Sequence, residues 1–200
     1  MNNLLDNFTK KDITHKETNS LCVDIRKSTK FHSNFSTKTE PAKIVASFIS
    51  KCYLICNNKK LFSNYIYAGD GIIAIAYGND NAKAFEKTLE VAIAISKVIE
   101  NFKDSCKKVF DAGIGIAFDN TTKVKVKNLP IQYNNELYTG DSVAISSKIC
   151  GSMPLRNNKY KTSIYIGMSK RFANNLLEKF SNHCKKTSKK YIYLGDSNAR

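Results

Sequence analysis

Residues 21–31 read Leu-Cys-Val-Asp-Ile-Arg-Lys-Ser-Thr-Lys-Phe, and this stretch decides the fold. Its apolar run, interrupted by Asp24, predicts a short buried strand that carries one carboxylate to its end. The residues after the strand are basic or bear hydroxyl groups, which predicts a turn with free backbone N–H groups. A strand, an acid and such a turn are the parts that bind a metal-chelated polyphosphate.

A second carboxylate stands 46 positions further along, in the segment Gly69-Asp70-Gly71. Runs of β-forming residues flank it, so residues 61–77 predict a hairpin with the Asp-Gly pair in its turn. In an antiparallel sheet the first strand and this hairpin are neighbours, and Asp24 and Asp70 then meet at one edge. Two such carboxylates bridge two divalent cations, which lie roughly 3.5–4 Å apart in two-metal sites. Taken singly, each acid also fits a local role in a loop or turn.

The remaining periodicity predicts an α+β order. Pro41 and the apolar residues after it predict a helix to about residue 57, and residues 82–103 predict the longest helix. Residues 112–118 predict a buried strand with residues 121–126 pairing beside it. A short helix at 142–150 is followed by a strand, a helix capped by Ser169 and a terminal strand. This is a ferredoxin-like βαββαβ core with a C-terminal αβ elaboration.

The domain organisation is simple. Residues 1–19 are polar and predict a flexible N-terminal lead-in, and residues 20–200 predict a single domain. Residues 27–40 predict a loop. No apolar run approaches the roughly 18 residues that span a bilayer, and the N-terminus lacks a signal-peptide pattern. We therefore expect a cytoplasmic protein with no direct membrane insertion.

The six cysteines contain no C-x-x-C pair, so we expect reduced thiols in the core. Cys52 and Cys56 lie one helical turn apart, which leaves a metal pair open. The net charge of +15 attracts polyanions, but the lysines are spread along the whole chain. A basic RNA-binding module with Tyr65 and Tyr67 as stacking groups is one alternative. Two acids at the sheet edge would repel phosphate in such a module, so we expect no nucleic-acid partner.

Four motifs resemble those of class III nucleotidyl cyclases, in that family's order. They are Val-Asp-Ile-Arg-x-Ser-Thr at 23–29, Gly-Asp-Gly at 69–71, Gly-Ile-Gly-Ile at 113–116 and Tyr-Thr-Gly-Asp-Ser-Val at 138–143. The resemblance covers about residues 20–195. It implies a head-to-tail homodimer with active sites at the subunit interface, two divalent metal ions (Mn²⁺ or Mg²⁺) and a nucleoside triphosphate substrate.

The same resemblance implies roles for individual residues. Asp24 and Asp70 match the metal-binding acids, and the Ile25 carbonyl matches a further metal ligand. The turn that holds the triphosphate corresponds to Arg26, Lys27, Ser28 and Thr29. The family's catalytic Arg falls at Lys148 and its catalytic Asn at Ala144. A triphosphate-binding lysine of the family corresponds to Lys186 or Lys185.

Two positions depart from the purine cyclases of the family. The residues that read the base correspond to Ile66 and Leu137, which offer no hydrogen bonds. A purine would lose roughly 1–3 kcal/mol for each polar group left unsatisfied. With the compact catalytic domain, this resembles the pyrimidine cyclases of bacterial anti-phage (Pycsar) systems. That resemblance implies UTP or CTP as substrate, a cyclic UMP or cyclic CMP product, and a separate effector protein that the product activates.

Other readings stay open at this stage. One is an adenylate or guanylate cyclase with base contacts from Asn64 or Thr139. Another is a cyclase-like pseudoenzyme, which Ala144 favours. Phe31 joins Tyr65 and Tyr67 as a candidate for stacking on the base.

Overall fold

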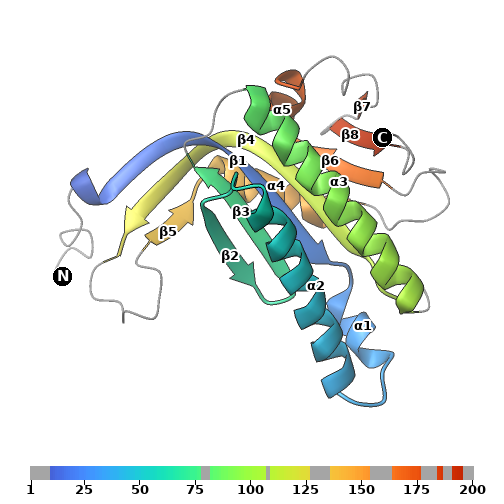
Figure 1. Cartoon of the computed structure of the whole chain (residues 1–200). Helices are drawn as coiled ribbons and strands as arrows, with labels where there is room; N and C mark the ends of the chain where they lie inside the picture. Colours follow the sequence, from blue (N-terminus) through green and yellow to red (C-terminus); the bar gives the residue numbers. More distant parts are fainter. Residues whose placement is uncertain are drawn as a thin grey trace.

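The computed structural model describes residues 10–77, 82–106, 109–126, 136–153, 164–176, 184–186 and 191–195. Its strands form one eight-stranded sheet in the order β2-β3-β1-β4-β6-β8-β7, with β5 paired to β4 (Figure 1). The strands are β1 Ile13–Ile25, β2 Asn64–Ala68, β3 Gly71–Tyr77, β4 Ala112–Lys125, β5 Glu136–Thr139, β6 Ile164–Met168, β7 Cys184–Lys186 and β8 Tyr191–Gly195. The helices are η1 Lys10–Asp12, α1 Ser28–Ser33, α2 Thr39–Asn58, α3 Ala82–Ser105, α4 Asp141–Ser152 and α5 Lys170–Asn174.

Strands β1 to β4 confirm the predicted ferredoxin-like core. Strand β1 pairs antiparallel with β3 on one side and with β4 on the other, and β2 pairs antiparallel with β3. Beyond β4, strand β6 joins in parallel and β8 and β7 follow in antiparallel fashion, which is the predicted C-terminal elaboration.

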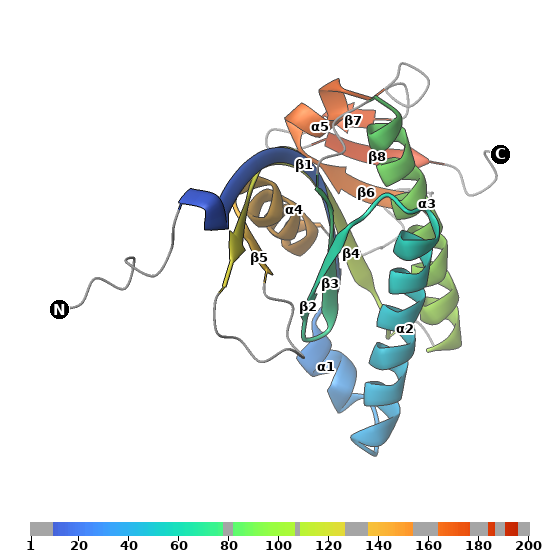
Figure 2. The same ribbon diagram turned by 60° about the vertical axis from the view of Figure 1, so that its left-hand side comes forward.

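The two faces of the sheet are covered differently (Figure 2). Helices α2 and α3 lie on one face, and α4 lies on the other. Because neighbouring residues of a strand point to opposite faces, Leu21 and Val23 join the large core beneath α2 and α3. Cys22 joins a smaller cluster with Tyr138 and Cys150 on the α4 face. Asp24 has the same parity as Cys22, so its carboxylate belongs to the α4 face.

Several predicted boundaries were wrong. Strand β1 begins at Ile13, and residues 13–19 pair with β4 instead of forming a flexible lead-in. The predicted loop after Lys27 contains α1. Residues 112–125 form one continuous strand, and β5 and β7 were not predicted. The paired halves of β1 and β4 are polar because much of this ribbon faces solvent, so hydrophobicity did not mark them.

Helix α2 accounts for two of the cysteines. Cys52 and Cys56 are fully buried in the large core, and burial raises the pKa of the Cys56 thiol to about 12. They are therefore core thiols, as expected. None of the described helices is long and apolar enough to cross a membrane.

Candidate active site

The two predicted metal acids lie at one edge of the sheet. Asp24 stands opposite Gly71 of β3 and Gly113 of β4 in the strand register. Asp70 directly precedes Gly71 in the β2–β3 turn. The structure thus brings together two acids that are 46 positions apart in the sequence.

The environment of Asp24 resists its ionisation. Burial raises the pKa of this carboxyl, the charge of Asp70 raises it further, and the Arg26 guanidinium opposes both effects. A Cβ at Gly71 would lie 2.7 Å from Asp24 Oδ1 and 2.9 Å from the Val23 carbonyl oxygen. Because glycine has no Cβ, position 71 leaves room for the Asp24 carboxylate.

The turn that presents Asp70 differs from the predicted one. Ala68 pairs with Gly71, so the two turn residues are Gly69 and Asp70 rather than the Asp-Gly pair. Gly69 has φ of 62°, and Asp70 is not among the non-glycine residues with positive φ in the described chain. A positive φ at the first turn position alone is typical of a type II′ turn. Asp70 thus occupies the second turn position, next to the strand that faces Asp24.

Arg26 connects this edge to helix α4. Its backbone N–H donates to the Asp111 carbonyl at 2.8 Å, and its Nη1 donates to the Gly151 carbonyl at 2.5 Å. Its Nε and Nη2 are buried against Gly113 without a hydrogen-bond partner among the described residues. A cation at the carbonyl end of a helix is favourable. The guanidinium therefore holds the C-terminal end of α4 close to Asp24.

The predicted triphosphate turn is the start of α1. Lys27 precedes the helix in the left-handed conformation, with φ of 51°, and its carbonyl accepts from the Phe31 N–H at 2.9 Å. Ser28 lines a cavity of about 660 Å³ together with His32, Asp70 and one side of α2. Lys27 and Thr29 are exposed. Ser28 and Asp70 therefore share a cavity, and His32 is a lining residue without a predicted role.

Phe31 does not belong to a base-binding surface. Its side chain is 1% exposed and makes edge contacts with Phe35 and Phe110, with ring centroids 5.1 and 5.6 Å apart. The prediction that it binds substrate was wrong, because the short helix α1 turns the ring into the core. Tyr65 similarly packs on Tyr53 of α2, whereas Tyr67 is exposed.

The two base-reading positions have different surroundings. Ile66 packs against the α4-face cluster, which includes Ile73 and Tyr138. Leu137 lies on the opposite face of β5 from Tyr138 and is 54% exposed. The described contacts bring Ile66, but not Leu137, into this cluster.

Tyr138 is a residue whose importance the sequence did not reveal. Its hydroxyl donates to Glu136 Oε2 at 2.5 Å, and its ring packs edge-on against Tyr77 with centroids 5.8 Å apart. Burial and the Glu136 charge raise the Tyr138 pKa, and the Asn64 side chain acts in the opposite direction. Tyr138 follows the exposed Leu137, so the alternation of a half-buried strand was the available signal.

Helix α4 is fixed to the sheet by buried hydroxyl groups. Ser142 Oγ lies 2.5 Å from Ser20 Oγ, 2.6 Å from Thr121 Oγ1 and 3.1 Å from Thr18 Oγ1. All four residues are fully buried. Ala144 and Lys148 are exposed on the outer side of the same helix, one turn apart. Lys148 is therefore presented away from its own sheet.

Lys186 is the last residue of β7. The predicted contact of its side chain falls outside the described part of the structure. So does the alternative contact of Lys185. Within the described residues, no three His, Cys, Asp or Glu side chains are grouped closely enough to hold a metal ion. Any ion at this edge would rely on Asp24, Asp70, backbone oxygens, water and ligand oxygens.

The fold is similar to that of several solved cyclases. The adenylyl cyclase CyaB from P. aeruginosa matches with a TM-score of 0.71 at 12% identity, over 94% of this chain and 97% of its own. The guanylate cyclase domain of RhGC from Catenaria anguillulae, in complex with GTP, matches with a TM-score of 0.70 at 15% identity, over 92% and 98%. The guanylyl cyclase Cya2 gives 0.68 at 12% identity, over 93% and 96%.

No protein-family model matches the chain, and the comparison with curated proteins found no match in sequence. At these low identities the structural similarity shows the fold alone.

Proposed function

We propose that the protein is a nucleotidyl cyclase, which converts a nucleoside triphosphate to its 3′,5′-cyclic monophosphate and pyrophosphate. The observation that carries the proposal is the pairing of Asp24 with Asp70 at one sheet edge. The pair lies beside a cavity lined by Ser28 and within a fold similar to adenylyl and guanylyl cyclases. The pair has no evident structural benefit here, because the charge of Asp70 raises the pKa of Asp24 and so disfavours its ionisation.

The residues present fit two divalent ions, Mg²⁺ or Mn²⁺. Carboxylates and backbone carbonyls are hard oxygen ligands, and Mg²⁺ typically binds through one or two carboxylates plus substrate phosphates. Asp24, Asp70 and the Ile25 carbonyl would hold the ions. When bound, these ions supply positive charge that favours ionisation of the ribose 3′ hydroxyl and neutralises pyrophosphate.

The protein's own groups position the reactants. The 3′ oxygen of the ribose forms a bond to the α-phosphorus while the bond between that phosphorus and the β-phosphate oxygen breaks, and the hydroxyl proton is released. In phosphoryl transfer of this kind, catalysis consists largely of positioning and charge stabilisation. The turn from Arg26 to Thr29 would hold the triphosphate, Arg26 also keeping α4 in place. Lys148 would contribute a cation from the partner subunit, and Lys186 remains a candidate for the triphosphate.

For the substrate we propose UTP or CTP. Ile66 places an aliphatic side chain on the α4 face, where it packs among apolar neighbours. The edge of a purine would find no hydrogen-bond partner at Ile66. Asn64 favours a second candidate, an adenylate or guanylate cyclase, because its amide lies on the same side of β2, near Tyr138.

Incubation of the purified protein with each of the four nucleoside triphosphates and Mn²⁺ or Mg²⁺ tests the proposal. We expect cyclic UMP or cyclic CMP as the main product, identified by mass spectrometry. A purine cyclic nucleotide would instead support the Asn64 reading. No product in any combination would support the alternative of a cyclase-like pseudoenzyme.

Replacement of Asp70 by alanine tests the metal site itself. We predict that Asp70→Ala abolishes turnover, because half of the carboxylate pair is lost. Folding should be little affected, since Asp70 occupies a partly exposed turn. The measurement is product formation beside a thermal unfolding curve. Undiminished activity would remove Asp70 from the site.

The biological role that we propose is second-messenger synthesis in bacterial anti-phage defence, in which the cyclic product activates a separate effector protein. This part rests on the motif resemblance. Bacteria that carry the gene with its neighbouring genes should resist phage, and Asp70→Ala should abolish the resistance. Equal resistance with the variant would contradict the role.

A further inference from the structure

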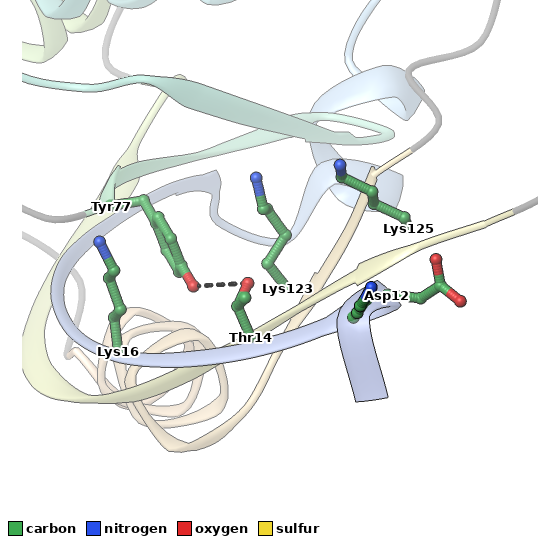
Figure 3. A pocket seen from close by; sticks show the side chains of 7 residues that line it. Asp12, Thr14, Lys16, Tyr77, Lys123 and Lys125 are labelled. Atoms are coloured by element: carbon green, nitrogen blue, oxygen red, sulfur yellow. Dashed lines mark hydrogen bonds between the residues drawn. The ribbon is translucent and has the colours of Figure 1, made fainter. Parts of the chain in front are cut away.

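A second polar cavity lies at the opposite end of β1 (Figure 3). It has a volume of about 250 Å³, and its lining contains the four lysines Lys11, Lys16, Lys123 and Lys125. Among the described lining residues Asp12 supplies the one carboxylate, and Thr14 and Tyr77 supply the uncharged part. The cavity therefore has a strong excess of positive charge.

The strand register explains why these lysines gather. Thr14 of β1 pairs directly with Lys123 of β4. Since alternate residues of a strand share a face, Lys16 projects on the same side as Lys123 and Lys125. Pairing of Thr18 with Tyr77 brings the Tyr77 ring of β3 between them. In Figure 3 the ammonium ends of Lys16, Lys123 and Lys125 point to the same side.

Within the part of the chain that the structure describes, these charges are only partly compensated. Lys123 Nζ lies 2.9 Å from Glu136 Oε1. The ammonium groups of Lys16 and Lys123 also lie 5.5 and 5.6 Å from the centroid of the Tyr77 ring, within range of a cation–π attraction. The Tyr77 hydroxyl donates to Thr14 Oγ1 at 3.0 Å, which fixes the ring. The ring thus fixes two cations in the lining of one cavity, and both attract an anion that enters it.

We propose that this cavity binds a small, multiply charged phosphate anion, either free pyrophosphate or the polyphosphate chain of a nucleotide. Lysine is a point-charge donor suited to phosphate. The small volume suits the phosphates rather than a whole nucleotide. A short concave site of this volume fits a compact anion better than an extended nucleic-acid strand.

The site is separate from the Asp24 edge. Lys16 and Asp24 are eight residues apart on β1, roughly 26 Å along an extended strand. The inference does not depend on the proposed cyclase activity. It holds or fails by anion binding, which is measured without metal and without turnover.

Isothermal titration of the full chain with pyrophosphate in metal-free buffer tests the proposal. We expect saturable binding that weakens with added salt, because exposed charges are screened. The double variant Lys16→Gln/Lys125→Gln should bind roughly tenfold or more weakly, since each substitution removes a charged donor. Lys123 is left intact so that Glu136 keeps its partner. The matched control is Lys87→Gln/Lys97→Gln, which removes the same charge from the exposed side of α3 and should bind like the wild type.

Each outcome has a clear meaning. Equal affinity for pyrophosphate and for a metal-free nucleoside triphosphate would support the proposal with phosphate as the recognised group. Tighter binding of the triphosphate, lost in the same double variant, would support a nucleotide as the source. No binding of pyrophosphate, or an equal loss in the α3 control, would overturn the proposal. Tighter binding of a short single-stranded RNA through the same lysines would also overturn it, in favour of a nucleic-acid surface.

Discussion

At the scale of single residues, Asp24 carries the clearest electrostatic consequence. Its pKa is raised by burial and by Asp70, so the folded protein holds that proton more tightly than the unfolded chain does. For such a group, the stabilising contribution is present at low pH and is lost as the pH rises through the folded-state pKa. Ionised Asp24 therefore destabilises the metal-free fold at neutral pH.

We predict that Asp24→Asn raises the melting temperature of the metal-free protein at neutral pH. The difference from the wild type should shrink as the pH falls toward the ordinary pKa of aspartate, near 3.9. Mn²⁺ should raise the melting temperature of the wild type but not of the variant, because only ionised Asp24 binds the ion. Thermal unfolding with and without Mn²⁺ over this pH range measures both effects. A variant that melts below the wild type at neutral pH would contradict the prediction.

The position of a residue could be predicted from the sequence where it follows from the order of the strands. Asp24 and Asp70 meet because β1 and β3 are neighbours, which the order of elements implies. The prediction that Phe31 contacts the substrate was wrong because the direction of its side chain does not follow from strand order. Its direction depends on a six-residue helix within a polar segment, and such a short helix is set by tertiary contacts rather than by periodicity.

At the scale of elements, the position of α4 depends on close approach to β4. A Cβ at Gly115 would collide with the Ser146 carbonyl oxygen and the Cys150 nitrogen. Helix α4 can therefore lie against this strand only if position 115 is glycine. The buried hydroxyl cluster at one end of α4 and Arg26 at the other complete the attachment.

We predict that Gly115→Ala lowers the free energy of unfolding by about 1–3 kcal/mol, because it overpacks this contact. For a chain of this length each 1 kcal/mol corresponds to roughly 2–4 °C in melting temperature. The variant should also lose activity at temperatures where it is still folded, since the displaced helix carries Lys148. The control is Gly151→Ala in the last turn of α4, where a Cβ meets nothing within 4 Å. Equal melting temperatures for the two variants would contradict the proposed contact.

Elements with apolar periodicity were predicted well, and solvent-facing ones were not. Helices α2 and α3 carry buried residues at regular intervals, and strand β3 is a continuous buried run, so their limits followed from hydrophobicity. The segment from Ile13 to Glu17 is mostly exposed and is a strand only because β4 pairs with it. A partner more than a hundred positions away leaves no mark on local sequence.

At the scale of the whole molecule, the exposed Lys148 leads to the shared-site prediction. Each Asp70→Ala subunit keeps Lys148, and each Lys148→Ala subunit keeps both acids. In a head-to-tail homodimer, a mixed dimer would thus have one complete site. We expect the two inactive variants to recover about a quarter of wild-type activity when mixed equally and randomly. Failure to recover activity, with mixed dimers demonstrated by differently tagged subunits, would contradict the shared site.

The central position of β1 also bears on how the chain is made. It is synthesised before either of its partners, residues 71–77 and 112–124. Until the second of them has been synthesised, the apolar segment around Leu21 has at least one unpaired edge, which is the condition that invites aggregation. Pairings at such sequence separation also slow folding, because the connecting chain must be ordered first. The strand on which the site is built is therefore also one that can misassemble during synthesis.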